Sequence, residues 1–185
     1  MISNLTTKAD LSQLILVDMQ TRLIAVMPQE ASQVTIKNAG ILAQAAAMLE
    51  VPIILTEQYP KGLGNTASEI LAFLPDTKPV EKLTFSCVAE PKFSRQLTRD
   101  RSQAVLAGME AHICILQTAM SLLATGKQVF VAEDAIISRD QANKANAIAR
   151  MRDAGCIISN TESIVFEWLG KAEGDAFKAI SKLIR

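Results

Sequence analysis

The sequence of 185 residues is poor in the side chains that most often bind metals, with one histidine and three cysteines. An odd and small number of cysteines argues against a disulfide framework and favours a reducing, cytoplasmic location. Cys87, His112, Cys114 and Cys156 do not follow the spacing of a usual zinc site. We therefore expect neither a metal nor another cofactor.

Long apolar runs and an excess of charge of one sign are also missing. No apolar segment approaches the roughly 20 residues that cross a bilayer, so we expect no membrane partner. The first residues, MISNLTTKADLSQ, lack the basic and apolar regions of a signal peptide. Basic and acidic side chains number 19 each, so the chain has no excess of positive charge for binding nucleic acid, and we expect no nucleic-acid partner. The length fits one domain over residues 1–185.

What the sequence does contain is an alternation of short apolar runs and longer amphipathic ones. Runs typical of buried strands cover residues 14–18, 52–57, 79–82, 103–108, 128–134 and 155–160. Helical spacing of apolar residues covers residues 29–50, 115–123, 140–155 and 173–185. This alternation predicts βαβ units and therefore an α/β fold with a parallel, doubly wound sheet. Residues 1–11 are expected to form a loose N-terminal segment.

Polar side chains at the predicted strand ends are the candidates for a functional site, because ligands bind beyond the carboxyl ends of strands in such sheets. The residues in these places are Asp18, Glu57, Gln58, Tyr59, Lys82, Met109 to Cys114, Glu133 and Asp134. An acid, a base and a thiol from three separate strands could therefore converge on one cleft.

The pKa of the Cys114 thiol must be lowered for the sulfur to act as a nucleophile near neutral pH. An unperturbed cysteine is only about 3% thiolate at pH 7, and a pKa of ~6 would require about 3.4 kcal/mol of stabilisation. A helix N-terminus supplies about 1 kcal/mol, so a cation is needed, and Lys82 is the candidate. His112 lies two residues before Cys114 and would point away on a helix, which leaves Asp18 to take the proton. On this view Lys82 and Asp18 keep the sulfur ionised near neutrality, although a structural role for a buried Cys114 is an equal alternative.

Three segments, LILVDMQ, EKLTFSC and GMEAHICILQTA, resemble in their order the isochorismatase-like cysteine hydrolases. TEQYPKGLG, VFVAEDAIISRD and ARMRDAGCIISNTES extend the resemblance to the subgroup of isochorismatase-domain-containing proteins, over about residues 12–185. The resemblance implies a three-layer fold with a six-stranded parallel sheet and helices on both faces. It also implies a homo-oligomer, a small-molecule substrate and a catalytic triad that falls on Asp18, Lys82 and Cys114.

The resemblance further implies a cis peptide bond between Met109 and Glu110. Such a bond would turn the backbone amides of Glu110 and Cys114 toward one point, as an oxyanion hole requires. The chain departs from the family in two ways, since Ala111 stands where many members have threonine and a single histidine cannot build the metal site of nicotinamidase-type relatives. Isochorismatase proper lacks the cysteine, so Cys114 argues against that reaction.

The predicted function is a metal-independent cysteine hydrolase that acts on a small amide or related carbonyl compound through a thioester. The candidate pocket residues are Leu23, Gln58, Tyr59 and Phe85. Gly62 and Gly64 lie in KGLGNTAS, which lacks the phosphate-loop pattern and is expected to form a mobile loop over the pocket. The alternatives are a catalytically degenerate binding or scaffold protein that retains the pocket, and a redox-sensing thiol at Cys114.

Overall fold

The computed structural model describes residues 5–184 of the chain. Its centre is a six-stranded sheet whose neighbouring strands are all parallel, in the order β3-β2-β1-β4-β5-β6. The strands are β1 (Ser12–Val17), β2 (Ile53–Gln58), β3 (Val80–Lys82), β4 (Gln103–Met109), β5 (Gln128–Ile137) and β6 (Ile157–Ser159). The chain builds outward from β1 to β3 and then returns to the centre with β4. The strand order therefore switches between β1 and β4, where α/β sheets bind their ligands.

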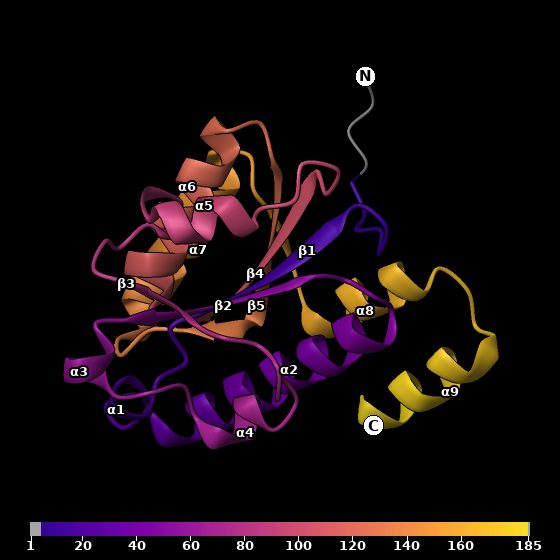
Figure 1. Ribbon diagram of the computed structural model, residues 1–185, viewed down its shortest axis with the longest axis horizontal. Coiled ribbons are helices and arrows are strands. Elements are labelled where there is room, and N and C mark those ends of the chain that lie inside the picture. Colours follow the sequence, from indigo (N-terminus) through magenta and orange to yellow (C-terminus); the bar gives the residue numbers. More distant parts are fainter. Residues whose placement is uncertain (1–4, 185) are drawn as a thin grey trace.

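Helices cover both faces of the sheet and give the predicted three layers (Figure 1). One layer contains α2 (Gln29–Met48), α4 (Ser68–Leu71), α8 (Thr161–Leu169) and α9 (Gly174–Leu183). The other contains α5 (Pro91–Gln96), α6 (Leu116–Ala124) and α7 (Gln141–Asp153). Short helical turns lie at Thr21–Ile24 (α1), Pro60–Leu63 (α3) and Cys87–Ala89 (η1). Within residues 5–184, no helix is long and apolar enough to cross a membrane.

The continuous apolar run of β1 is explained by burial on both faces. Leu14 and Leu16 belong to the hydrophobic cluster on the α2 side, whereas Ile15 and Val17 belong to the cluster on the side of α6 and α7. A strand covered on both faces has no solvent-facing positions, so its sequence shows no polar alternation.

The N-terminal segment differs from the prediction in its second half. Residues 1–4 lie outside the described part of the chain. Thr7 is buried, and its backbone N–H and hydroxyl donate to the Glu167 carboxylate at 2.7 and 2.8 Å. The Lys8 N–H donates to Gln103 Oε1 at 2.8 Å. This part of the segment is therefore fixed to α8 and β4 and is not loose.

The fifth strand is longer than predicted, and this removes Glu133 and Asp134 from the strand ends. β5 continues to Ile137, with a register shift in its pairing with β4 between Leu106 and Gly108. Asp134 Oδ1 accepts hydrogen bonds from the N–H and hydroxyl of Thr161 at 2.8 and 2.9 Å. The carboxylate of Asp134 therefore holds the start of α8.

Candidate active site

The three residues of the expected triad come from the ends of three strands. Asp18 directly follows β1 in the left-handed conformation, at φ 52°, which aspartate tolerates better than most residues. Lys82 is the last residue of β3, and Cys114 lies in a π-helical turn, Ala111–Ile115 (η2), that connects β4 to α6. Because all three strands end at the same edge of the sheet, their side chains converge there.

The close approach of β1 and β4 at this edge depends on Gly108. Its φ is +123°, and a Cβ atom at this position would lie 2.0 Å from the Val17 carbonyl oxygen. No side chain fits between these strands. The Met109–Glu110 peptide bond that follows is cis, at the position expected.

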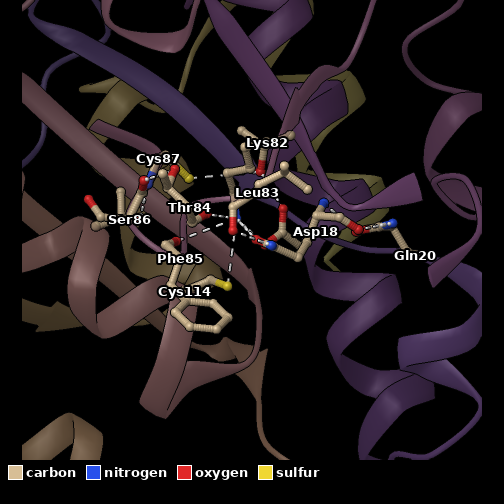
Figure 2. A network of polar contacts seen from close by, with 12 residues as sticks. Asp18, Gln20, Lys82, Leu83, Thr84, Phe85, Ser86, Cys87 and Cys114 are labelled. Atoms are coloured by element: carbon tan, nitrogen blue, oxygen red, sulfur yellow. Dashed lines mark hydrogen bonds and ion pairs between the residues drawn. The ribbon is translucent and has the colours of Figure 1, made fainter. Parts of the chain in front are cut away.

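The structure brings Asp18, Lys82 and Cys114 together (Figure 2). Lys82 Nζ lies 2.6 Å from Asp18 Oδ2 and 3.6 Å from Cys114 Sγ. The second carboxylate oxygen, Asp18 Oδ1, accepts a hydrogen bond from the Thr56 hydroxyl at 2.7 Å. The side chains of Asp18 and Lys82 are both fully buried, so their ion pair is shielded from solvent.

The surroundings favour the protonated form of the lysine, whereas burial and the Asp18 charge favour the neutral form of the cysteine. Burial lowers the pKa of Lys82, but the Asp18 carboxylate, together with Cys87 and Cys114 in their ionised forms, more than offsets this, and the net shift is upward. Burial and then the Asp18 charge raise the pKa of the Cys114 thiol, and a hydrogen bond to Asp18 acts in the same direction. Lys82 lowers this pKa without reversing the shift. The prediction that folding ionises the sulfur near neutrality is therefore wrong, because desolvation outweighs the attraction of one ammonium already paired with a carboxylate.

The turn that carries Cys114 is held from its other side by residues that follow β5. The Glu110 carboxylate, only 5% exposed, accepts from the backbone N–H of Arg139 at 2.9 Å and from its Nε at 3.1 and 3.2 Å. The Nδ1 atom of His112 lies 2.9 Å from the Ser138 hydroxyl. The histidine therefore pairs with Ser138, in keeping with the expectation that it does not assist Cys114.

The candidate pocket residues have different surroundings. Gln58 lies inside the polar network, where Oε1 accepts from Lys82 Nζ at 2.7 Å. The carbonyl of Phe85 lies 3.4 Å from the same Nζ, and its side chain is about half exposed. Tyr59 is also half exposed, in a left-handed conformation at the start of α3. Leu23 packs against the hydrophobic cluster on the α2 side.

A cavity of about 400 Å³ lies along β3 and the residues that follow it. Its lining includes Tyr59, Lys82, Leu83, Thr84, Glu90 and Lys92. The loop of residues 61–68, which was expected to be mobile, lies next to this cavity. Arg22 donates a hydrogen bond to the Gly62 carbonyl at 2.7 Å and Gln20 donates one to the Gly64 carbonyl at 2.6 Å, and these bonds hold the loop in place.

Several residues of the network were not predicted. The partners of Gln20, Thr56 and Arg139 in this network are Gln58, Asp18 and Glu110, respectively. Each pair joins elements that are distant in sequence. Cys87 is a second buried thiol beside Lys82, and burial raises its pKa to about 11. Across residues 5–184, no group of three histidine, cysteine or acidic side chains is placed to hold a metal ion.

The chain resembles known proteins over most of its length. The Isochorismatase domain family matches residues 12–163. Isochorismatase domain-containing protein 2 from Danio rerio is 39% identical over 99% of this chain and 90% of its own length, and the human protein is 40% identical over 94% and 83%. A relative from Phytophthora sojae, 38% identical over 81% of this chain and 74% of its own, is named a secreted isochorismatase effector.

Solved structures show the same fold. The structure described as MAR1 ribonuclease from Caenorhabditis elegans has a TM-score of 0.90 and 32% identity, and covers 97% of this chain and 92% of that one. The YcaC product of Escherichia coli, described as an octameric hydrolase of unknown specificity, has a TM-score of 0.87 at 21% identity over 97% and 89% of the two chains. From the domain match and the relatives near 40% identity, we conclude that the chain belongs to the isochorismatase family of the isochorismatase-like hydrolase superfamily.

Proposed function

We propose that the chain is a cysteine hydrolase that cleaves a small amide or related carbonyl compound without a metal. The observation that supports this most strongly is the buried contact of Lys82 Nζ with both Asp18 and Cys114, at 2.6 and 3.6 Å. A nucleophile, a base and a cation at the switch point of the sheet form an arrangement suited to covalent catalysis.

In the proposed reaction, the Cys114 proton passes to Asp18 while the sulfur attacks the carbonyl carbon. Because burial and the Asp18 charge raise the pKa of the thiol, we propose that this proton leaves during the attack and not before it. Lys82 stabilises the negative charge that develops on the sulfur. The backbone amides of Glu110 and Cys114 stabilise the charge on the carbonyl oxygen.

The second half of the reaction uses the same base. The C–N bond breaks as Asp18 returns the proton to the leaving amine, which leaves an acyl group on Cys114 as a thioester. Water then attacks the thioester and gives its proton to Asp18, the C–S bond breaks, and Asp18 returns the proton to the Cys114 sulfur as the acid product leaves.

Ammonia release from a panel of small primary amides tests this function. We expect the wild-type protein to release ammonia from at least one amide, and Cys114→Ala to release none while keeping its melting temperature. Turnover by Cys114→Ser near the wild-type rate would show that the sulfur is not the nucleophile.

A binding or scaffold protein without turnover is the second candidate, and the raised pKa of Cys114 favours it. It predicts that small amides bind, as measured by calorimetry, but are never cleaved. A ribonuclease is a third candidate because of the description of the C. elegans structure. Cleavage of RNA by the wild-type protein, with loss in Cys114→Ala, would support that activity over amide hydrolysis.

We also propose a homo-oligomer, because the octameric E. coli protein shares the fold. Sedimentation velocity measures the assembly directly. A cytoplasmic location stays a prediction, since a relative is named a secreted effector.

A further inference from the structure

Both ends of the Gln58 side-chain amide are used inside the protein. Oε1 accepts a hydrogen bond from Lys82 Nζ at 2.7 Å, and Nε2 donates to the Leu83 carbonyl at 2.8 Å. The reverse orientation of the amide would place donors against the ammonium and an acceptor against the carbonyl, so the partners fix the orientation. This is not the arrangement expected of an amide that binds substrate.

The backbone of Gln58 is fixed as firmly as its side chain. Gln20 is fully buried, and its Oε1 accepts from the Gln58 N–H at 2.7 Å while its Nε2 donates to the Gln58 carbonyl at 3.0 Å. The side chain of Gln20 therefore pairs in both directions with the end of β2. The backbone from which the Gln58 side chain extends to Lys82 is therefore held in place.

An ammonium has three N–H donors, and the contacts of Lys82 show how they are divided. The two shortest contacts are with Asp18 Oδ2 at 2.6 Å and Gln58 Oε1 at 2.7 Å. The remaining donor faces the carbonyls of Thr84 and Phe85, at 3.3 and 3.4 Å, and Cys114 Sγ at 3.6 Å. The acceptor that Gln58 provides thus directs the third donor toward the sulfur.

The neutrality of this acceptor matters as much as its position. A carboxylate in the same place would put a second anion on Lys82 and weaken the attraction of the ammonium for a thiolate. We propose that Gln58 is a positioning residue, which holds the Lys82 ammonium against Cys114 without adding charge, and not a substrate contact. The proposal rests on the proposed function in that it assigns this ammonium to the nucleophile.

The pH dependence of Cys114 reports on this arrangement in the absence of substrate. Burial and the Asp18 charge raise the pKa of the thiol, Lys82 lowers it, and Cys87 raises it. The other charged or titratable groups of the turn have partners of their own: Glu110 pairs with Arg139, and His112 with Ser138. A change at Gln58 that weakens the effect of Lys82 must therefore raise the pKa of Cys114 further.

The test is the rate of alkylation of Cys114 by iodoacetamide against pH, measured by mass spectrometry of the peptide that contains Cys114. This readout separates Cys114 from the other two thiols. The variants are Gln58→Glu, which adds charge, and Gln58→Met, which removes the acceptor at similar size. Gln13→Met is the matched control, because the buried Gln13 amide binds Gln96 and Thr98 at the opposite end of β1.

We expect alkylation of Gln58→Glu at pH 8 to be at least about tenfold slower than that of the wild type, a shift of the profile by about one pH unit. Gln58→Met should be about threefold slower, and Gln13→Met should match the wild type. Profiles of both Gln58 variants that overlay the wild type would overturn the proposal, as would an unchanged profile with a raised KM for an amide. If Gln58→Glu does not fold, Gln58→Met decides alone.

The outcomes also separate this proposal from the proposed function. A shifted profile without amide turnover in any protein would keep the positioning role and reject the hydrolase. Amide turnover with unshifted alkylation profiles would support the hydrolase and reject the positioning role of Gln58.

Discussion

Lys82 holds the candidate site together through a buried ion pair with Asp18. Removing one partner of such a pair leaves an uncompensated charge in the interior, which costs about 3–5 kcal/mol. We therefore expect Lys82→Met to lower the free energy of unfolding by about 3 kcal/mol or more. The addition of Asp18→Asn should recover part of this loss, because it removes the unpaired carboxylate.

Urea unfolding of the two single variants and the double variant measures this coupling. A double variant whose loss equals the sum of the two single losses would contradict the ion pair, since independent residues give additive effects. Lys127→Met, which removes a partly buried lysine bound to the backbone carbonyls of Thr98 and Arg101, is a control for the loss of a lysine side chain.

At the scale of elements, the turn after β4 depends on an anchor from the end of β5. The Glu110 carboxylate is buried, but the Arg139 side chain that binds it is largely exposed. Arg139→Ala would leave the backbone N–H of residue 139 as a partner, so we expect a loss of about 1 kcal/mol in unfolding free energy. The rate of amide turnover should fall by more than this small loss of stability would cause, because the turn carries both proposed oxyanion donors.

Arg139→Lys should recover part of the activity, because it restores a cation near the carboxylate but not the paired geometry of the guanidinium. Activity of Arg139→Ala equal to the wild type would show that the turn keeps its shape without the anchor.

The junction of β1 and β4 offers a second prediction at this scale. Gly108→Ala should be strongly destabilising, because the left-handed backbone costs about 1–2 kcal/mol and the new Cβ would collide with the Val17 carbonyl. Gly126→Ala is the matched control, since Gly126 also has a positive φ, +84°, but a Cβ there would meet no other described part of the chain within 4 Å. Thermal unfolding should show a much larger loss for Gly108→Ala, and equal losses would mean that the strands can separate.

For the whole molecule, the sequence predicted the layers and the sheet because their signals are local. The continuous apolar run of β1 and the helical spacing of apolar residues in α7 depend on near neighbours. The length of β5 was not predicted, because its last residues pair only after a register shift against β4. The helix α8 was also missed, although its start has a local cap, the Asn160 side chain that accepts from the Ser163 N–H, besides the bonds to Asp134.

The candidate site was likewise predicted in part from the sequence. Strand-end positions placed Asp18, Lys82 and Cys114 among the candidates, and the resemblance implied that they form a triad; the structure brings the three together. The direction of the pKa shift of Cys114 was not predictable, because it depends on how deeply the folded chain buries the sulfur. Gln58 was assigned to the substrate pocket because sequence position does not reveal hydrogen-bond partners such as Lys82 and Leu83.

Detection of an acyl group on Cys114 tests the proposed mechanism most directly. A small primary amide that is turned over is mixed with the protein, the reaction is quenched with acid within the first turnover, and the intact mass and the peptide that contains Cys114 are measured. We expect a mass increase equal to the acyl group at Cys114 in the wild type, and no such increase in Cys114→Ala. Ammonia release by Cys114→Ala at the wild-type rate, or an acyl group on a different residue, would contradict it.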